Sequence, residues 1–480
     1  MKKLITLIAA SFLLVGCVSV DESPYETQTI DEASVDSTSK TEKTPTDKTS
    51  VLTYYNGGAG TDRLTAVKRD SSGNYYFLGH TSGDLFDIVD GSTATGDTDS
   101  SLDDIIFVKL DLDGNVVCEI QTGSSYSDAT YGNSLVVNDD YIYIGYSYSN
   151  GSDRVAILAQ FNNPSSSSDC AASLVTQVEI DSSDGGDEDI KALLEDSNGN
   201  IYAVGQTSGT LESSNEGSED FFVKKYSSDL SLDWTYQGGS SAADIATAGV
   251  MTTDGFLIVA GYTSGDFRGT NEGGTDAVYV KIRKSSGSLT GGEQFGTSGD
   301  ETQVNVFYDV DGYSYINILG QVGASETMND TDFTLGETFN ATYSSSGTHQ
   351  TTYSYCGTGT SDSVLPVPAA VDSSGRYYIQ TLGSCDQLYS SQMPSKSTTQ
   401  YLLKTTKRGS GLGGYAHSGG NFTIYAIGYD TIDGYPLGAG SYFEASDGST
   451  FGGSTVDSSE DAVGGQLVTI SNSSGLMSGN

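Results

Sequence analysis

The sequence predicts an all-β fold built from a repeated unit of about sixty residues. Two similar strings, GQTSGTLESSNEGSEDFFVKKY at 205–226 and GYTSGDFRGTNEGGTDAVYVKI at 261–282, each place Gly-x-Thr-Ser-Gly before a polar stretch, an Asp and an apolar strand. The glycine of the preceding strand recurs at positions 79, 145, 205, 261 and 320, at intervals of 66, 60, 56 and 59 residues. The 60 glycines and 31 tyrosines among 480 residues also favour strands joined by tight turns. These observations together predict the four-stranded blades of a β-propeller.

Each predicted blade contains four strands, labelled A to D from the centre outward. Strand A is exemplified by TAVKRD at 65–70 and strand B by NYYFLG at 74–79. They are joined by the hairpin turns DSSGN at 70–74, DSNGN at 196–200 and DSSGR at 372–376, where Gly supplies the positive φ. Strand C recurs seven times, from IIFVKLD at 105–111 to VGGQLVTI at 463–470, whereas strand D recurs six times.

The missing seventh D strand is expected at the other end of the chain. VLTYYNGG at 51–58 is similar to LDWTYQGG at 232–239 and precedes the first A strand. We therefore expect the N-terminal strand to complete the C-terminal blade, which gives a closed seven-bladed propeller over residues 51–480 with no exposed sheet edges.

The unit GNIYAVGQTSG…SEDFFVKKY resembles the bacterial β-propeller repeat known as SBBP. The resemblance covers residues 51–480 and is clear in blades 1, 3 and 4 but degraded in blades 5 to 7. That family is defined by its repeat, so the resemblance implies the fold and no particular activity.

The N-terminus, MKKLITLIAASFLLVGC, combines two lysines, a short apolar run and a small residue before Cys17. Leu14-Val15-Gly16-Cys17 resembles a bacterial lipobox, which implies a signal peptide at 1–16 and diacylglycerol with further acyl chains, such as palmitate, on Cys17. Val18 resembles the pattern for sorting to the outer membrane, facing either the cell surface or the periplasm. Residues 17–50 are polar and read as a flexible tether. The alternative is an ordinary signal peptide or an uncleaved anchor.

The chain is strongly acidic, with 63 acidic and 22 basic residues and a formal net charge of −41. Binding to phosphates requires the opposite sign, so nucleic acid is excluded as the expected partner. Such a surface attracts cations or basic partners, although it also serves solubility alone.

Two series of aspartates follow from the strand register. One series precedes the A strands, with Asn421 near the seventh position: Asp62, Asp128, Asp189, Asp244, Asp300 and Asp362. The other series precedes the C strands, with Gln400 in the remaining blade: Asp104, Asp153, Asp220, Asp276, Asp332 and Asp461. The D–A and B–C loops of an up-and-down blade lie on one face, so both series are expected at one rim. This rim suits Ca²⁺ as a metal cofactor, or a cationic partner; the alternative is that each Asp caps its own loop.

Four cysteines follow Cys17, namely Cys118, Cys170, Cys356 and Cys385. They allow three disulfide pairings in a compartment that permits oxidation. The repeat register favours Cys118–Cys170 and Cys356–Cys385, and free buried thiols are the alternative.

Signatures of catalysis are weak. The three histidines, at 80, 349 and 417, lie in no metal-binding spacing, and GSGLGG at 409–414 lies in a strand hairpin without a following helix. LDLDGN at 110–115 reads as a hairpin turn, because the twelfth position of a calcium loop counted from Asp111 would be Thr122.

We therefore expect a non-catalytic binding module of the cell envelope. Its expected role is surface adhesion or recognition of a protein, glycan or cation. The alternatives are a periplasmic scaffold for envelope assembly and, in a different class, a hydrolase or lyase acting on polysaccharide.

Overall fold

The computed structural model describes residues 53–56, 62–81, 103–112, 115–122, 128–131, 133–165, 174–212, 215–308 and 314–355, together with the strand backbones between 369 and 466. The chain divides into two units, Met1–Thr49 and Ser50–Asn480, and all described residues belong to the second. The predicted signal peptide (1–16), Cys17 and the whole predicted tether (17–50) lie outside the described residues. No helix among the described residues is long and apolar enough to cross a membrane.

The described part of the chain is all-β and contains no helix, which confirms the predicted fold class. Its first three sheets comprise β2 (Asp62–Arg69), β3 (Tyr75–Thr81), β4 (Asp104–Leu110) and β5 (Val116–Thr122); β6 (Asp128–Ala129), β7 (Leu135–Val137), β8 (Tyr141–Ser149), β9 (Arg154–Asn162) and β10 (Leu174–Ile180); and β11 (Glu188–Glu195), β12 (Ile201–Thr207), β13 (Asp220–Tyr226) and β14 (Leu232–Gly238).

The following two sheets comprise β15 (Asp244–Met251), β16 (Phe256–Thr263), β17 (Asp276–Arg283) and β18 (Leu289–Phe295); and β19 (Thr302–Tyr308), β20 (Ile316–Gln321), β23 (Thr338–Tyr343) and β24 (His349–Tyr355). The last two comprise β25 (Ala369–Val371), β26 (Tyr377–Leu382), β27 (Gln400–Thr405) and β28 (Gly411–His417); and β29 (Phe422–Asp430), β30 (Tyr435–Tyr442), β33 (Ala462–Gln466) and β1 (Thr53–Asn56). Two short hairpins are β21 (Thr327–Met328) with β22 (Thr331–Asp332), and β31 (Thr450–Phe451) with β32 (Ser454–Thr455).

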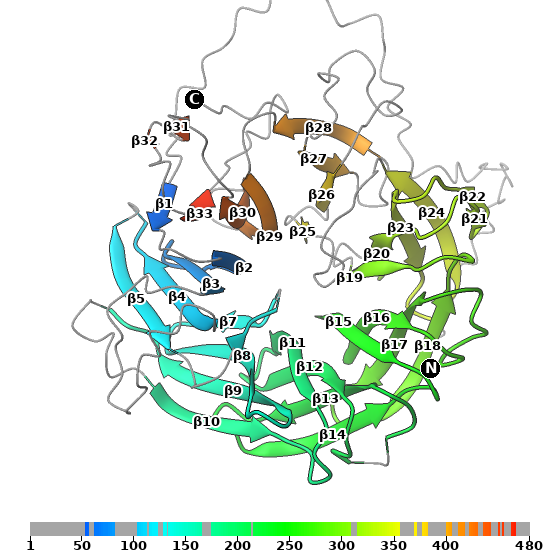
Figure 1. Cartoon of the computed structure of the whole chain (residues 1–480), viewed down its shortest axis with the longest axis horizontal. Coiled ribbons are helices and arrows are strands. Elements are labelled where there is room, and N and C mark those ends of the chain that lie inside the picture. The colour runs from blue at the N-terminus through cyan, green and yellow to red at the C-terminus, as the bar shows by residue number, and fades with distance from the viewer. Residues whose placement is uncertain are drawn as a thin grey trace, which may run out of the picture. The chain divides into compact units, whose positions relative to one another are not determined.

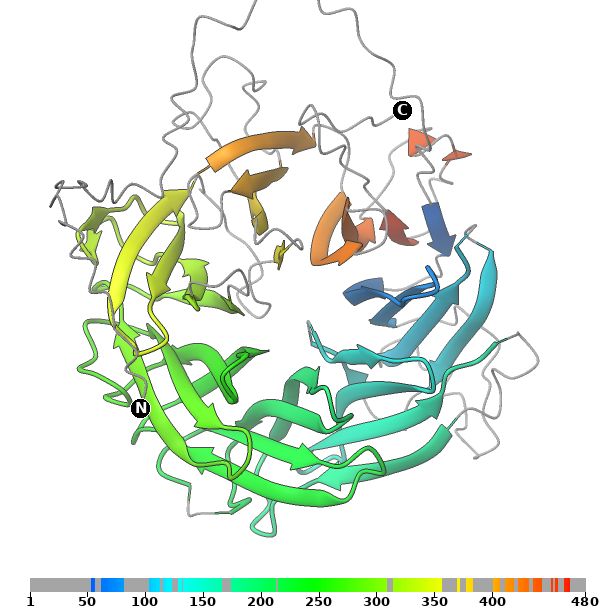
Figure 2. The ribbon, with the colours of Figure 1, turned by 180° about the vertical axis from the view of Figure 1, so that it is seen from behind.

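The strand order within the sheets is that of propeller blades. The β11–β14 and β15–β18 sheets run in chain order with antiparallel neighbours, as the predicted A-to-D order requires. Figure 1 shows β2, β11, β15 and β19 innermost and β5, β14 and β18 outermost, and Figure 2 shows the same order from behind. The first strand of one sheet packs against the next sheet, as β11 does against β15 and β15 against β19. We call each of these sheets a blade.

The N-terminal strand pairs with the C-terminal part of the chain. β1 is antiparallel to β33 in the register Thr53↔Gln466 to Asn56↔Val463, and β33 in turn pairs with β30. Residues 53–56 thus occupy the fourth position of a sheet whose other strands begin at Phe422.

Aromatic side chains fill the space between neighbouring blades. Tyr279 of β17 and Tyr343 of β23 lie with ring centroids 5.2 Å apart, and Phe295 of β18 meets Phe339 of β23 edge to face at 5.8 Å. All four are buried, and they belong to one apolar cluster that spans the two blades. Burial of such rings is the main stabilising contribution to blade packing. Among the tyrosines of the B strands, Tyr76, Tyr143 and Tyr202 are 0–1% exposed, whereas Tyr75 and Tyr141 are half-buried.

The repeated glycine of strand B is explained by a close backbone approach. A Cβ at Gly261 would collide with the carbonyl oxygen of Ile245 on the preceding A strand, and one at Gly205 would collide with that of Asp189. The A strands are bulged at this level, between Ala246 and Ala248 in β15. The bulge brings the two backbones together, so a residue without a side chain is required.

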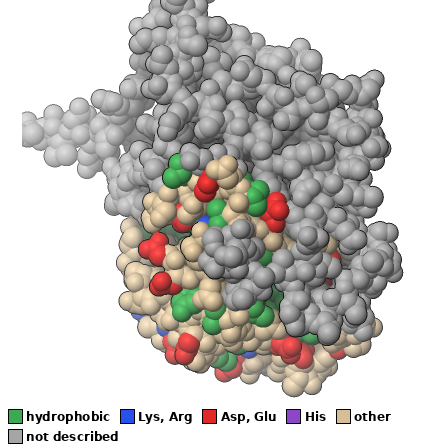
Figure 3. Space-filling view, turned by 90° about the vertical axis from the view of Figure 1, so that its left-hand side faces the viewer, with side chains coloured by type: hydrophobic (Ala, Val, Ile, Leu, Met, Phe, Trp, Pro, Cys, Tyr) green, Lys and Arg blue, Asp and Glu red, His purple; other side chains and the backbone are tan. Residues whose placement is uncertain are grey.

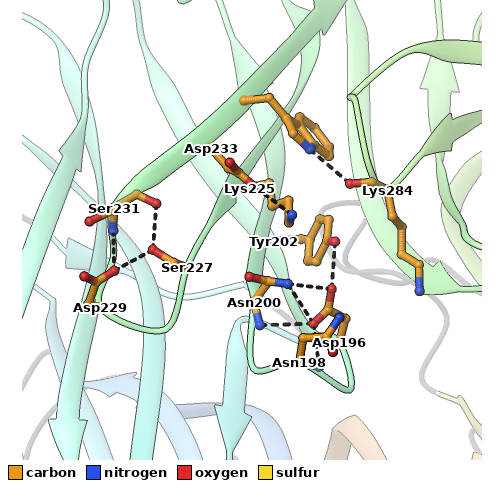
Figure 4. A network of polar contacts seen from close by, with 11 residues as sticks. Asp196, Asn198, Asn200, Tyr202, Lys225, Ser227, Asp229, Ser231, Asp233 and Lys284 are labelled. Atoms are coloured by element: carbon orange, nitrogen blue, oxygen red, sulfur yellow. Dashed lines mark hydrogen bonds and ion pairs between the residues drawn. The ribbon is translucent and has the colours of Figure 1, made fainter.

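The A–B turns are held by an aspartate that accepts several hydrogen bonds. Asp196 accepts the backbone N–H of Asn198 and Asn200, the Asn200 side-chain amide and the Tyr202 hydroxyl (Figure 4). Asp70 makes the same set of contacts in the first blade. The turn glycine, Gly199, has φ 76°, as predicted for DSNGN. The hairpin reading of LDLDGN is also confirmed, because the Asp111 N–H donates to the Asn115 carbonyl.

Candidate functional site

The loops on one face of the blades form the candidate site. A strands start, B strands end and C strands start at this face, so the D–A and B–C loops meet there. We define the loop face as residues 181–187, 208–212, 215–219, 239–243, 264–275, 296–300 and 323–337. These ranges hold one basic residue, Arg268, and the following acidic residues: Asp181, Asp184, Asp187, Glu212, Glu216, Glu219, Asp266, Glu272, Asp300, Glu326, Asp330, Asp332 and Glu337. From the side shown in Figure 3, several acidic side chains and little blue are visible on the described part of the surface.

The structure separates the predicted aspartates into buried and exposed groups. The buried ones are Asp128, Asp189, Asp220, Asp244 and Asp276, each at most 2% exposed. Asp104 and Asp153 are half-buried, and Asp300 and Asp332 are exposed. Asp62 begins β2, and Asp362 and Asp461 lie outside the described residues. The aspartates of the two series therefore form no single exposed surface among the described residues.

Two of the A-strand positions are shifted by one residue from the prediction. Thr263 of β16 pairs with Asp244 on one side and Asp276 on the other. The equivalent Thr207 pairs with Glu188, not Asp189. In the fifth blade the buried acid before β19 is Glu301, whereas Asp300 is exposed. Side chains of successive residues point to opposite sides of a strand, so a shift of one residue changes the surroundings of the acid. Glu301 is buried and Asp300 exposed, whereas Glu188 and Asp189 are both buried on different sides of their strand.

The assignment of Asp332 to the start of a C strand is wrong. Asp332 lies in β22, a short hairpin inserted before the true C strand, β23. Its carboxylate accepts a hydrogen bond from Thr327 within that hairpin. The acid directly before β23 is Glu337, whose carbonyl accepts the Val322 N–H.

The C-strand aspartates fix their B–C loops through a glutamine of strand D. Asp276 Oδ2 accepts Gln294 Nε2 at 3.0 Å and the Glu272 backbone N–H at 3.0 Å. Gln294 Oε1 accepts the N–H groups of Phe267 and Arg268. Asp220 and Gln237 make the equivalent contacts in the preceding blade, and Gln121 donates to Asp104 in the first. These hydrogen bonds are those of a loop cap.

Neighbouring blades bring two carboxylates together at a glycine. A Cβ at Gly239 would lie 2.5 Å from Asp220 Oδ1 and 2.7 Å from Asp244 Oδ2, so the two oxygens are at most 5.2 Å apart, the sum of those distances. Asp276 Oδ1 and Glu301 Oε2 approach Gly296 in the same way. We call these two sites the carboxylate junctions.

A backbone hydrogen bond joins the blades at each carboxylate junction. The Asp244 N–H donates to the Glu219 carbonyl at 2.8 Å, and the Glu301 N–H donates to the Thr275 carbonyl at 2.7 Å. The Asp128 N–H makes the same bond to Asp103. Asp104, which follows Asp103, and Asp128 therefore occupy corresponding positions between the first two blades.

Burial disfavours the charged form of the junction carboxylates. It raises the pKa of Asp220, of Asp244 and of Asp276 above the ordinary value. It raises the pKa of Glu301 to about 7, with a smaller contribution from the nearby Asp276 charge. Ser240 and Thr297 oppose this effect by donating backbone and hydroxyl hydrogen bonds to Asp244 and Glu301.

Asp189 has a different environment, because two basic side chains neutralise it. Its Oδ2 lies 2.7 Å from Arg154 Nη1 and 3.1 Å from Lys191 Nζ. Burial opposes ionisation of Asp189, but the attraction of Lys191 and Arg154 holds the pKa of its carboxyl below the usual range. Lys191 Nζ also lies 3.3 Å from the centroid of the Tyr131 ring, a cation–π contact. This cluster joins the second blade, through Arg154 and Tyr131, to the third blade, through Asp189 and Lys191.

The described residues contain no group of three or more His, Cys, Asp or Glu side chains able to hold a metal ion. The fully buried junction carboxylates also offer no acid or base to a polysaccharide at the surface. Cys118 is disulfide-bonded, and Cys170, Cys356 and Cys385 lie outside the described residues, so the predicted pairing stays a prediction.

No family model matches the sequence, and no curated protein matches it. Solved structures that are similar include the β-propeller domain of the trilobed protease from Pyrococcus furiosus, with 10% identity and a TM-score of 0.41 over 80% of this chain and 94% of that chain. The quinohemoprotein alcohol dehydrogenase ADHIIG from Pseudomonas putida HK5 has 8% identity and a TM-score of 0.43 over 81% and 66%. The Pan2 WD40 domain of Neurospora crassa has 10% identity and a TM-score of 0.37 over 65% and 72%. At TM-scores below 0.5, neither activity nor ligand is transferred from these proteins.

Proposed function

We propose that this protein is a lipid-anchored, non-catalytic β-propeller of the bacterial cell envelope that binds a positively charged partner through its loop face. The observation that carries the proposal is the charge of that face, where a single arginine stands among thirteen acidic residues. Glu212, Glu216, Asp266 and Glu272 are exposed there. A surface of one sign attracts ligands of the other sign and raises their local concentration.

The fold part of this proposal is a seven-bladed propeller closed by its N-terminal strand. It is supported by the pairing of β1 with β33, which gives the sheet that starts at Phe422 a fourth strand. A second support is the contact of β2 with β29 and β30, which brings that sheet against the first blade. Closure of this kind leaves no long sheet edge open to association.

The proposed location is supported by the N-terminal sequence. Leu14-Val15-Gly16-Cys17 supports processing to a lipidated Cys17, and Val18 supports sorting to the outer membrane. The polar stretch at 18–50 supports a tether between the anchor and the propeller. On the cell surface the protein would act in adhesion or recognition, and on the periplasmic side it would act as an assembly scaffold.

The partner that the loop face fits is a basic segment of a protein, or a glycan that carries amino groups. The exposed carboxylates of Glu212, Glu216 and Glu272 accept no hydrogen bond from another described residue, whereas their backbones are fixed by Gln237, Asp220 and Asp276. Backbone positions held in this way lower the ordering cost of binding, so that mainly the rotamer freedom of the glutamate side chains is lost.

The test uses a lysine-rich peptide and the full-length protein at several salt concentrations. We expect binding that weakens as salt rises, and a loss of at least severalfold in affinity on combined Glu212→Gln, Glu216→Gln and Glu272→Gln substitution. The matched control, Asp140→Asn with Asp233→Asn and Asp254→Asn, removes three charges from the opposite face and should retain binding. Equal loss in both variants would show that only net charge matters, and would refute a specific face.

The location is tested by protease treatment of intact cells, with a known periplasmic lipoprotein as control. Digestion of the propeller while the control survives would place the loop face outside the cell. Survival of both until the membrane is permeabilised would instead favour the periplasmic scaffold.

A further inference from the structure

The carboxylate junctions contain buried oxygen atoms with no hydrogen-bond donor. Asp220 Oδ1, Asp244 Oδ1 and Asp276 Oδ1 have no partner, and all three side chains are fully buried. Asp220 Oδ1 and Asp276 Oδ1 are also the atoms that approach Gly239 and Gly296, where the carboxylate of the next blade lies. An acceptor that is buried without a donor costs about 1–3 kcal/mol, and more when it is charged.

The junction carboxylates also lack a basic neighbour. The ion pairs among the described residues use Asp189, Asp233 and Asp254. The boundary between the second and third blades therefore has a built-in counterion, since Arg154 and Lys191 neutralise Asp189 there. No described lysine or arginine plays this part for Asp220, Asp244, Asp276 or Glu301. At each junction two buried carboxylates therefore approach one glycine without a described positive charge beside them.

We propose that each carboxylate junction binds a hard divalent cation of the Ca²⁺ class between neighbouring blades. The ion would take the place that Arg154 and Lys191 have at the preceding boundary, and Asp220 Oδ1 and Asp276 Oδ1 would face it. Ca²⁺ is bound by oxygen ligands in flexible geometry, and carboxylates up to 5.2 Å apart can both reach one ion at 2.3–2.6 Å. This inference concerns buried sites and does not depend on the ligand of the loop face.

The number of carboxylates sets the expected affinity. Two per junction is a small set, and no third His, Cys, Asp or Glu joins them among the described residues. Backbone carbonyls and water would complete the shell. Calcium sites with few charged ligands bind at about 10⁻⁴–10⁻³ M, as in extracellular modules. We therefore expect saturation at millimolar Ca²⁺.

The first measurement is Ca²⁺ binding to the chelator-treated, full-length protein by equilibrium dialysis, with Mg²⁺ compared in parallel. We expect at least two Ca²⁺ per chain, weaker Mg²⁺ binding, and a melting temperature that rises by a few degrees in 5 mM Ca²⁺. The wild-type protein alone can refute the proposal: no bound Ca²⁺ and an unchanged melting temperature would overturn it.

Two substitutions assign the ions to the junctions. Asp244→Asn and Glu301→Gln keep an oxygen acceptor for Ser240 and Thr297 but remove the charge. Each should remove one bound Ca²⁺ per chain and part of the thermal shift, and the double variant should remove both ions. Asp254→Asn, on the opposite face, is the charge-matched control and should bind the same number of Ca²⁺ ions as the wild type.

Two other outcomes would contradict the proposal. If the double variant still binds the same number of ions, the ions lie elsewhere. The wild-type melting temperature could also be unchanged by Ca²⁺ while both variants have a higher melting temperature than the wild type at neutral pH. That result would show that each carboxylate pair binds a proton and not a cation. Unchanged binding of the lysine-rich peptide in these variants separates this test from that of the loop face.

Discussion

Replacing Gly239 by alanine should loosen the boundary between the third and fourth blades. The added Cβ would lie 2.5 Å from Asp220 Oδ1 and 2.7 Å from Asp244 Oδ2, closer than such atoms approach in folded proteins. Neither carboxylate can move away freely, because Gln237 holds Asp220 and Ser240 holds Asp244. Relieving the clash requires breaking one or two of these hydrogen bonds, at about 0.5–1.5 kcal/mol each. With overpacking strain, we expect a loss of about 1–3 kcal/mol.

The assay is thermal and urea unfolding of the full-length protein, compared with two other glycines. A Cβ at Gly291 would meet no atom within 4 Å, so Gly291→Ala should be neutral or slightly stabilising. A Cβ at Gly261 would meet the Ile245 backbone, which cannot turn aside, so Gly261→Ala should be the most destabilising of the three. If Gly239→Ala unfolds like Gly291→Ala, the two carboxylates do not meet at this glycine, and the cation-site argument loses its geometry.

Three further predictions concern other parts of the molecule. Burial raises the pKa of Glu188 and of Glu301 to about 7 from 4.5, so each binds a proton more tightly when folded. In chelator, the unfolding free energy should therefore rise as pH falls from about 7 to about 4.5, by up to about 3 kcal/mol per carboxyl, and Glu301→Gln should remove its share from a pH series of urea unfolding. Asp196→Ala removes the acceptor of the Asn198, Asn200 and Tyr202 donors and should cost about 1–3 kcal/mol in the same assay, more than Asp229→Ala in its exposed turn; equal costs would contradict the capping role. Deleting residues 51–58 should expose the β33 edge and cause aggregation in light scattering, and a soluble product of equal stability would refute closure by β1.

The elements of a blade could be predicted from sequence because their signals are local. The turns at Asp70 and Asp196 follow from Asp-Ser-x-Gly-Asn, and the strand glycines at 205 and 261 mark a repeated close approach. The hairpin that contains Asp332 was missed because its short strands carry no repeat signature.

Which acidic side chains are buried at the blade boundaries could not be predicted with the same accuracy. Glu188-Asp189 and Asp300-Glu301 are adjacent pairs, and the side of the strand that each acid faces depends on the length of the D–A loop and on strand phase. Both acids of the first pair are buried, whereas only Glu301 of the second is. The pairing of carboxylates across blades depends on packing between units. One sequence signal would have found it: glycine, then Ser or Thr, then an acid four residues later, as in Gly239-Ser240…Asp244 and Gly296-Thr297…Glu301.

The different chemistry of the blade boundaries has a consequence for how the molecule opens. In repeat folds each unit contacts its neighbours only, so stability is a sum of unit and interface contributions. The boundary at Asp189 carries its own counterions, whereas no described basic residue pairs with the carboxylates at Gly239 and Gly296, where the proposed cation would come from the solvent. Cooperativity along the chain is therefore uneven and adjustable: in ion-poor medium, amide hydrogen exchange should start in the strands at the boundaries on either side of the fourth blade, while the boundary between the second and third blades stays protected.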